Sequence, residues 1–119
     1  MRPKSVDEYR ERFRANLIGR WETAAKTEAL SKEVFVFNED GSGSVDTDTF
    51  GVIESEPIQW RAVGDLTIEI RSLAFDSPFT KVPYDFRMAE IGKGLGIVVF
   101  ELRRSGFFTS RHPLRFLGE

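Results

Sequence analysis

The sequence predicts a mainly β protein: an antiparallel up-and-down β-barrel of about eight strands, preceded by one N-terminal α-helix. Apolar residues recur every three or four positions only near the N-terminus, whereas from Arg20 onward they alternate every second position. The alternating segments are short, rich in Val, Ile, Phe, Trp and Thr, and separated by Gly, Pro, Asn and Asp. No helical segment lies between them, which favours antiparallel hairpins over parallel strands joined by crossover helices.

The helix is expected at about residues 5–18. Ser5 and Glu8 form a capping-box pattern at its start, and Gly19 supplies a natural stop. The apolar positions between them form one stripe at helical spacing: Val6, Tyr9, Phe13 and Leu17. A helix this short is not stable alone, so we expect it to pack on the rest of the protein.

Strands are expected at about residues 20–26, 32–38, 43–53, 58–63, 66–73, 82–91, 95–103 and 112–117. In the fifth of these, Leu66, Ile68 and Ile70 share one face and the polar residues between them share the other. Such strands can bury their apolar faces in a sandwich or in a closed barrel. Closure also removes exposed edges and is therefore favoured, with the helix covering an opening or an edge.

Three turns are expected between strands, at residues 38–43, 63–65 and 92–94, where glycine permits positive φ angles. Residues 74–81, which include Pro78, form the longest irregular loop predicted.

The composition indicates a single domain spanning residues 1–119. The chain has 119 residues, of which 17 are Lys or Arg and 19 are Asp or Glu, with a net charge of −2. This balance does not favour nucleic-acid binding, which needs a surplus of basic residues. The absence of Cys excludes disulfides and thiolate chemistry. No leader or membrane-spanning pattern is recognised, so a cytoplasmic location is expected, with no membrane partner.

Several short motifs resemble one family. The segment Leu17-Ile18-Gly19-Arg20-Trp21 resembles the Gly-x-Trp start of lipocalin-like, or calycin, β-barrels. The turn at residues 41–43, the pair Trp60-Arg61 and the segment Tyr84-Asp85-Phe86 are similar to small lipocalin-like bacterial domains. This resemblance covers most of the chain by strand order and implies a cup that holds a small apolar molecule.

The resemblance also implies structural roles at the closed end of the barrel. Gly19 and Trp21 form the motif, and Trp21 would pack across that end beneath a basic side chain from a late strand. Arg115 and Arg103 are the candidates for this cover.

Aromatic residues are the most unusual part of the composition, with eleven Phe, two Trp and two Tyr. The alternation turns four candidate ligand-binding residues into the barrel: Trp60, Tyr84, Phe86 and Met88. An eight-stranded barrel is either filled by its side chains or holds one small ligand, and both alternatives stay open. The pair Phe107-Phe108 either seals a barrel end or forms an exposed patch for a partner.

Other candidate sites are weaker. Residues 38–46 match much of a calcium loop, but Thr49 stands where a bidentate Glu belongs and a strand precedes the loop, so a plain hairpin turn is favoured. His112 lacks a recognisable triad or metal-ligand spacing. Paired-acid catalysis is disfavoured because Glu69 and Asp85 fall on faces opposite the apolar ones.

The sequence therefore favours a non-catalytic protein that binds an apolar or amphipathic small molecule, without cofactor or metal. The alternative is a protein-interaction module, such as a stress-response or toxin-neutralising partner, that acts through its outer surface. A second copy of the chain is one candidate partner. An enzyme is the least favoured class, because no nucleophile and base can be recognised together.

Overall fold

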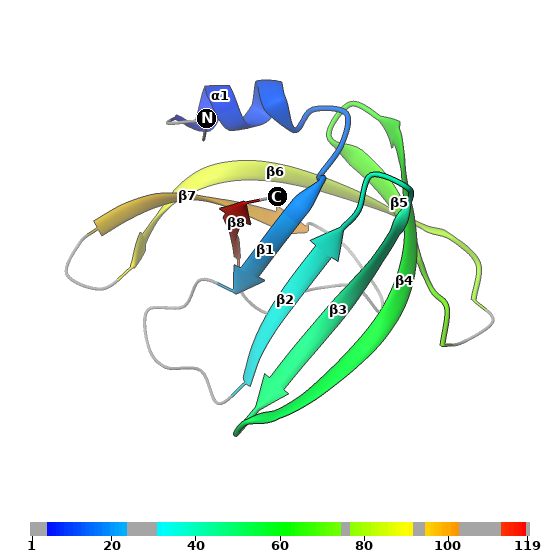
Figure 1. The fold of residues 1–119 in the computed structure, drawn as a ribbon. Helices are drawn as coiled ribbons and strands as arrows, with labels where there is room; N and C mark the ends of the chain where they lie inside the picture. Colours follow the sequence, from blue (N-terminus) through cyan, green and yellow to red (C-terminus); the bar gives the residue numbers. More distant parts are fainter. Residues whose placement is uncertain (1–4, 24–30, 75–76, 92–94, 103–112, 119) are drawn as a thin grey trace.

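The strands and the helix follow one another along the chain in the order that the sequence predicts (Figure 1). The computed structural model describes residues 5–23, 31–74, 77–91, 95–102 and 113–118. The elements are α1 (Val6–Arg12), β1 (Gly19–Thr23), β2 (Ser31–Phe37), β3 (Ser42–Thr49), β4 (Val52–Gly64), β5 (Thr67–Ser72), β6 (Thr80–Ile91), β7 (Leu95–Leu102) and β8 (Leu114–Gly118).

The eight strands form a closed antiparallel barrel, which confirms the predicted fold class. Each strand pairs with the next, and β8 pairs with β1 to close the wall. The register sets Trp21 of β1 opposite Phe35 of β2 on one side and opposite Phe116 of β8 on the other. Residues opposite each other point to the same face, so this pairing turns three aromatic side chains into the barrel together.

The helix α1 begins as predicted but ends earlier. The Ser5 hydroxyl accepts a hydrogen bond from the backbone N–H of Glu8. The helix ends at Arg12 instead of near residue 18, because the following carbonyl groups bind to the barrel. Tyr84 donates its hydroxyl hydrogen to the carbonyl of Phe13 at 2.5 Å, and the backbone N–H of Leu66 donates to the carbonyl of Arg14 at 2.8 Å.

The predicted third strand, residues 43–53, is wrong in its second half. Phe50 and Gly51 have φ angles of 54° and 84° and form a turn, so β3 ends at Thr49 and β4 begins at Val52. Residues 54–57, expected to link two strands, belong to β4 and pair with β3. The error arises because Phe is typical of strands and rare at positive φ.

The core occupies the barrel interior and the face of α1 that lies over one barrel end. In Figure 1, α1 lies above the barrel, and the β3–β4 hairpin points the opposite way. The predicted helix stripe is buried there: Tyr9 is 8% exposed, Phe13 1% and Leu17 0%, and Val6 packs against them. Among the described residues, no helix combines the length and apolar character that a membrane crossing requires.

Candidate functional site

The barrel end beneath α1 is filled by packed aromatic rings. The indole of Trp21 lies 4.9 Å from the ring of Phe13 and 4.8 Å from that of Phe116, centroid to centroid, and 6.1 Å from Phe86. Its Nε1 donates a hydrogen bond to the carbonyl of Leu17 at 3.0 Å. These contacts give Trp21 a structural role, since both its ring and its one polar atom are used within the protein.

Gly19 is required beside this cluster. Its φ of 136° is unfavourable for a residue with a side chain, and a Cβ atom there would meet the Phe116 ring at 2.5 Å. The Gly-x-Trp motif therefore has a packing reason in this chain: glycine lets the ring of the last strand lie against the first strand.

The basic cover of the rings comes from the helix. The guanidinium of Arg12 lies 5.1 Å from the Phe13 ring and 5.4 Å from the Phe116 ring. The expectation that Arg115 covers Trp21 is wrong, because Arg115 is opposite Glu22 in the register and so lies on the outer face, while Trp21 points inward. Arg103, the other candidate, lies outside the described residues.

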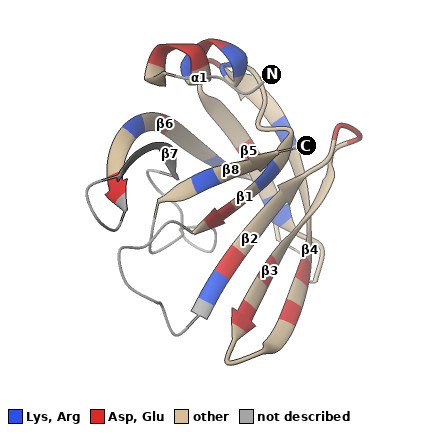
Figure 2. Cartoon of the chain, turned by 60° about the vertical axis from the view of Figure 1, so that its left-hand side comes forward, with Lys and Arg blue, Asp and Glu red and all other residues tan. Residues whose placement is uncertain are grey.

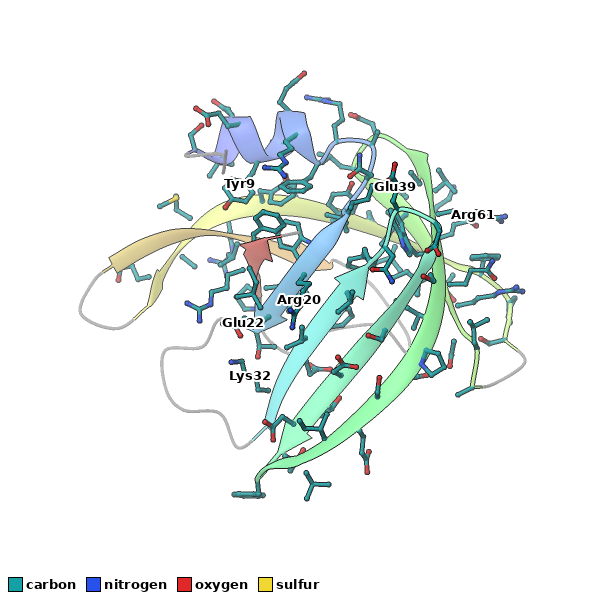
Figure 3. All side chains as sticks on the ribbon, viewed as in Figure 1. Tyr9, Arg20, Glu22, Lys32, Glu39 and Arg61 are labelled. Atoms are coloured by element: carbon teal, nitrogen blue, oxygen red, sulfur yellow. The ribbon has the colours of Figure 1, made fainter. Side chains whose placement is uncertain are left out.

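Glu22 is a buried carboxylate on the outer face of β1, and sequence reasoning did not single it out. It is 5% exposed and accepts hydrogen bonds from Arg115, whose Nε lies at 2.7 Å, and from Lys32, whose Nζ lies at 2.7 Å. Figure 3 shows Lys32 reaching toward Glu22 from the neighbouring strand. Burial alone raises the pKa of Glu22, but the hydrogen bonds from Lys32 and Arg115 outweigh it and hold that pKa below its ordinary value.

Three of the four predicted interior residues lie where the alternation places them. Trp60 is 6% exposed, Tyr84 2% and Phe86 2%. Their polar atoms are already used: Trp60 Nε1 donates to the carbonyls of Asn38 and Ser42, both at 3.1 Å, and Tyr84 donates to Phe13. These residues therefore build the filled part of the barrel and offer a ligand no unused hydrogen-bond donor.

Met88 does not line the barrel interior. It is 54% exposed, in contrast to the prediction. Met88 is opposite Val98, whereas β8 pairs with Val99 and Phe100, the next residues of β7. The β6–β7 hairpin therefore projects past the closed wall, and Met88 lies on the projecting part.

The inner face changes character toward the barrel end opposite α1. Phe35, Val45 and Ile58 point inward, and every second residue along a strand points to the same face. Polar residues at such positions on these strands and on neighbouring strands therefore also point inward. They are Thr23, Glu33, Thr47, Glu56, Ser72 and Thr80, which we call the polar end.

Two hydrogen bonds fix part of the polar end. Ser72, which is 4% exposed, donates its hydroxyl hydrogen to Oε1 of Glu56 at 2.5 Å. The backbone N–H of Glu33 donates to Oγ1 of Thr23 at 3.3 Å. The other carboxylate oxygen of Glu56 lies where the apolar and polar parts of the interior meet. Sequence reasoning missed Glu56 because it expected residues 54–57 to link two strands, whereas they belong to β4.

The remaining predicted sites have structural partners. The turn at residues 38–43 is a hairpin in which Asp40 accepts hydrogen bonds from the backbone and side chain of Ser42. On the outer face, Glu69 is bound by Arg61 and Asp85 by Arg10, as the predicted faces require. In the described part of the chain, no group of three or more His, Asp or Glu side chains is arranged to hold a metal ion. His112 and the pair at residues 107–108 lie outside it.

The chain was compared with protein-family models, curated proteins and solved structures, and none of these comparisons found a match.

Proposed function

We propose that the chain is a lipocalin-like, non-catalytic cytoplasmic protein that binds an amphipathic small molecule at the polar end of its barrel. The observation that carries the proposal is the division of the inner face. Rings and aliphatic side chains fill the half beneath α1, whereas Glu56 and Ser72 mark the beginning of a polar half at the other end.

The division indicates the chemistry of the ligand. Its apolar part would lie against Val45, which is 9% exposed and borders the polar end. Its polar part would face the carboxylate of Glu56. A cationic head group such as an ammonium suits this carboxylate, since an opposite charge near a protein surface adds up to about 1 kcal/mol.

The direct test is calorimetric titration with two single-chain amphiphiles that differ only in head-group charge, decylammonium and decyl sulfate, each below its micelle-forming concentration. We expect decylammonium to bind about fivefold or more tightly than decyl sulfate, the ratio that about 1 kcal/mol gives. The variant Glu56→Gln should remove most of this preference, because the amide can still accept from Ser72 but carries no charge.

Glu69→Gln is the matched control, because it removes the same charge from the outer face, where Arg61 binds it. The preference should survive in this variant. Binding of neither amphiphile, or an equal effect of the two substitutions, would contradict the proposal.

A second candidate function, interaction with a protein through the outer surface, is supported by a different observation. Among the described residues, Phe50, Val52 and Ile53 expose more than 60% of their surface at the tip of one hairpin. Large apolar side chains grouped at the surface are typical of interaction sites.

A further inference from the structure

The turn between β3 and β4 carries the most exposed large apolar side chains described. Phe50 is 78% exposed, Val52 64% and Ile53 68%. They form the apolar tip of the β3–β4 hairpin, which extends away from α1 (Figure 1). Because these side chains are so exposed, burial in the core does not explain why apolar residues occupy this tip.

The turn holds Phe50 in an unfavourable backbone conformation. Its φ of 54° lies in the left-handed region, where residues with a bulky side chain are rare and Asn or Gly is preferred. The turn is fixed by Gly51, whose φ is 84° and whose N–H donates to Oδ1 of Asp48 at 2.9 Å. A strained residue with an exposed ring indicates a role outside the fold.

The strands next to the tip carry negative charge. Asp46 and Asp48 lie on the outer face of β3, and Ile53 of the tip is opposite Asp48 on that face. Figure 2 shows acidic residues along these strands toward the tip. Lys32 is opposite Asp48 in the register, but its Nζ binds Glu22. A partner for the tip therefore needs apolar surface together with positive charge.

The same chain presents such a surface, which we call the basic face. The guanidinium groups of Arg61 and Arg71 lie 4.0 Å and 4.8 Å from the centroid of the Phe79 ring. Lys81 and Arg61 are both opposite Glu69 in the register and so share the outer face, and Leu73, two residues from Arg71, is 53% exposed. Glu69 binds Arg61 and offsets one of the three positive charges, so the basic face stays positive.

Both surfaces include residues of β4, and this position allows two copies of the chain to contact each other through both surfaces at once. Ile53 of the tip and Arg61 of the basic face are eight residues apart on one strand and point to the same outer face, a span of about 26 Å at 3.3 Å per residue. If a two-fold axis crosses the outer face between them, the tip of each copy reaches the basic face of the other. Both contacts then form at once, and the assembly ends at two copies.

We propose that the chain forms a two-fold dimer in which the Phe50 tip of each copy docks on the basic face of the other. The opposite charges select this partner, and the rings of Phe50 and Phe79 supply the apolar contact. Each contact rests on one turn and a few side chains, so we expect a weak dimer that forms reversibly at micromolar concentration.

Sedimentation equilibrium over about 5 to 500 μM, a range that brackets a micromolar Kd, tests the proposal. The wild type should shift from monomer to dimer as its concentration rises, and high salt should weaken the dimer by screening the charges. The variant Phe50→Asn should stay monomeric while its melting temperature rises, because Asn accepts positive φ and the ring is lost. Thus its loss of association cannot result from unfolding.

Two further variants separate the surfaces. Lys81→Glu should weaken the dimer about tenfold or more through the basic face, as loss of a central contact does. Met88→Gln is the control, because Met88 is exposed on a different hairpin, and it should leave the dimer unchanged.

Three results would overturn the proposal. The first is a monomer at every concentration, and the second is a dimer that tolerates both Phe50→Asn and Lys81→Glu. The third is Phe50-dependent binding to phosphatidylcholine and phosphatidylglycerol vesicles without a dimer, which would assign the tip to a lipid surface.

Discussion

The hydrogen bond between Tyr84 of the barrel and the end of α1 permits a test at two pH values. Tyr84 is 2% exposed and donates to the carbonyl of Phe13 just after the helix. In Tyr84→Phe the ring remains, but the carbonyl loses its donor in a dry environment. We expect the free energy of unfolding to fall by about 1–3 kcal/mol at pH 7, the cost of an unsatisfied buried polar group.

Tyr84 also makes the stability of the protein depend on pH in the alkaline range. Burial, with a contribution from the negative charge of Asp65, raises the pKa of Tyr84 above its ordinary value of about 10. Its stabilising effect is therefore complete below pH 10 and declines as the pH rises further, since the unfolded chain releases the proton first. At pH 11 the free energy of unfolding of the wild type should be about 1.4 kcal/mol lower than at pH 7 because of Tyr84, and this decrease should be absent in Tyr84→Phe.

Urea unfolding at pH 7 to 11, followed by tryptophan fluorescence, measures both effects. Tyr9 is present in both proteins, so its titration cancels in the comparison, and Tyr9→Phe provides a further control. The difference in free energy of unfolding between the wild type and Tyr84→Phe should become smaller from pH 7 to pH 11. An equally stable Tyr84→Phe at pH 7, or a gap that stays constant up to pH 11, would refute this assignment of the Tyr84 hydroxyl.

The remaining predictions concern the outer ion group and two glycines. The pKa of Glu22 is lowered in the folded protein, so Glu22 stabilises the fold above its unfolded pKa of about 4.3. This stabilisation is lost as the pH falls below that value. Glu22→Gln should therefore flatten an acid-unfolding curve measured by circular dichroism. A curve of unchanged slope would argue against the ion group. Gly43→Ala should lower stability by about 1–3 kcal/mol in thermal unfolding, since its Cβ would collide with the carbonyl of Val36. Gly64→Ala, with no atom within 4 Å of its Cβ, should change stability by less than about 0.5 kcal/mol; equal effects of the two would contradict the packing at Gly43.

The predictable part of the fold is the part encoded in local periodicity. The two-residue alternation placed Trp60, Tyr84 and Phe86 on inner faces, because one buried face forces apolar residues to every second position. The capping box located the start of α1 for a similar reason, since its donor and acceptor lie three residues apart.

Features that depend on residues distant in the sequence could not be predicted from local periodicity. The early end of α1 depends on Tyr84 and Leu66, and the burial of Glu22 depends on Arg115, 93 residues away in sequence. The barrel register brings these groups together, and nothing local to them specifies it. The inward Glu56 was missed for a local reason: residues 54–57 were expected to link two strands, whereas β4 contains them and continues the alternation of Ile58 and Trp60 to Glu56.

We propose a barrel with a filled end beneath α1 and a polar end for a ligand. Two-dimensional amide NMR of the protein during titration with decylammonium tests it most directly. The account predicts that shifts concentrate at the backbone amides of Glu33, Thr47, Glu56 and Ser72, while those of Tyr9, Phe13 and Trp21 stay in place. Shifts centred on Trp21 and Phe86, or none at saturating amphiphile, would contradict it.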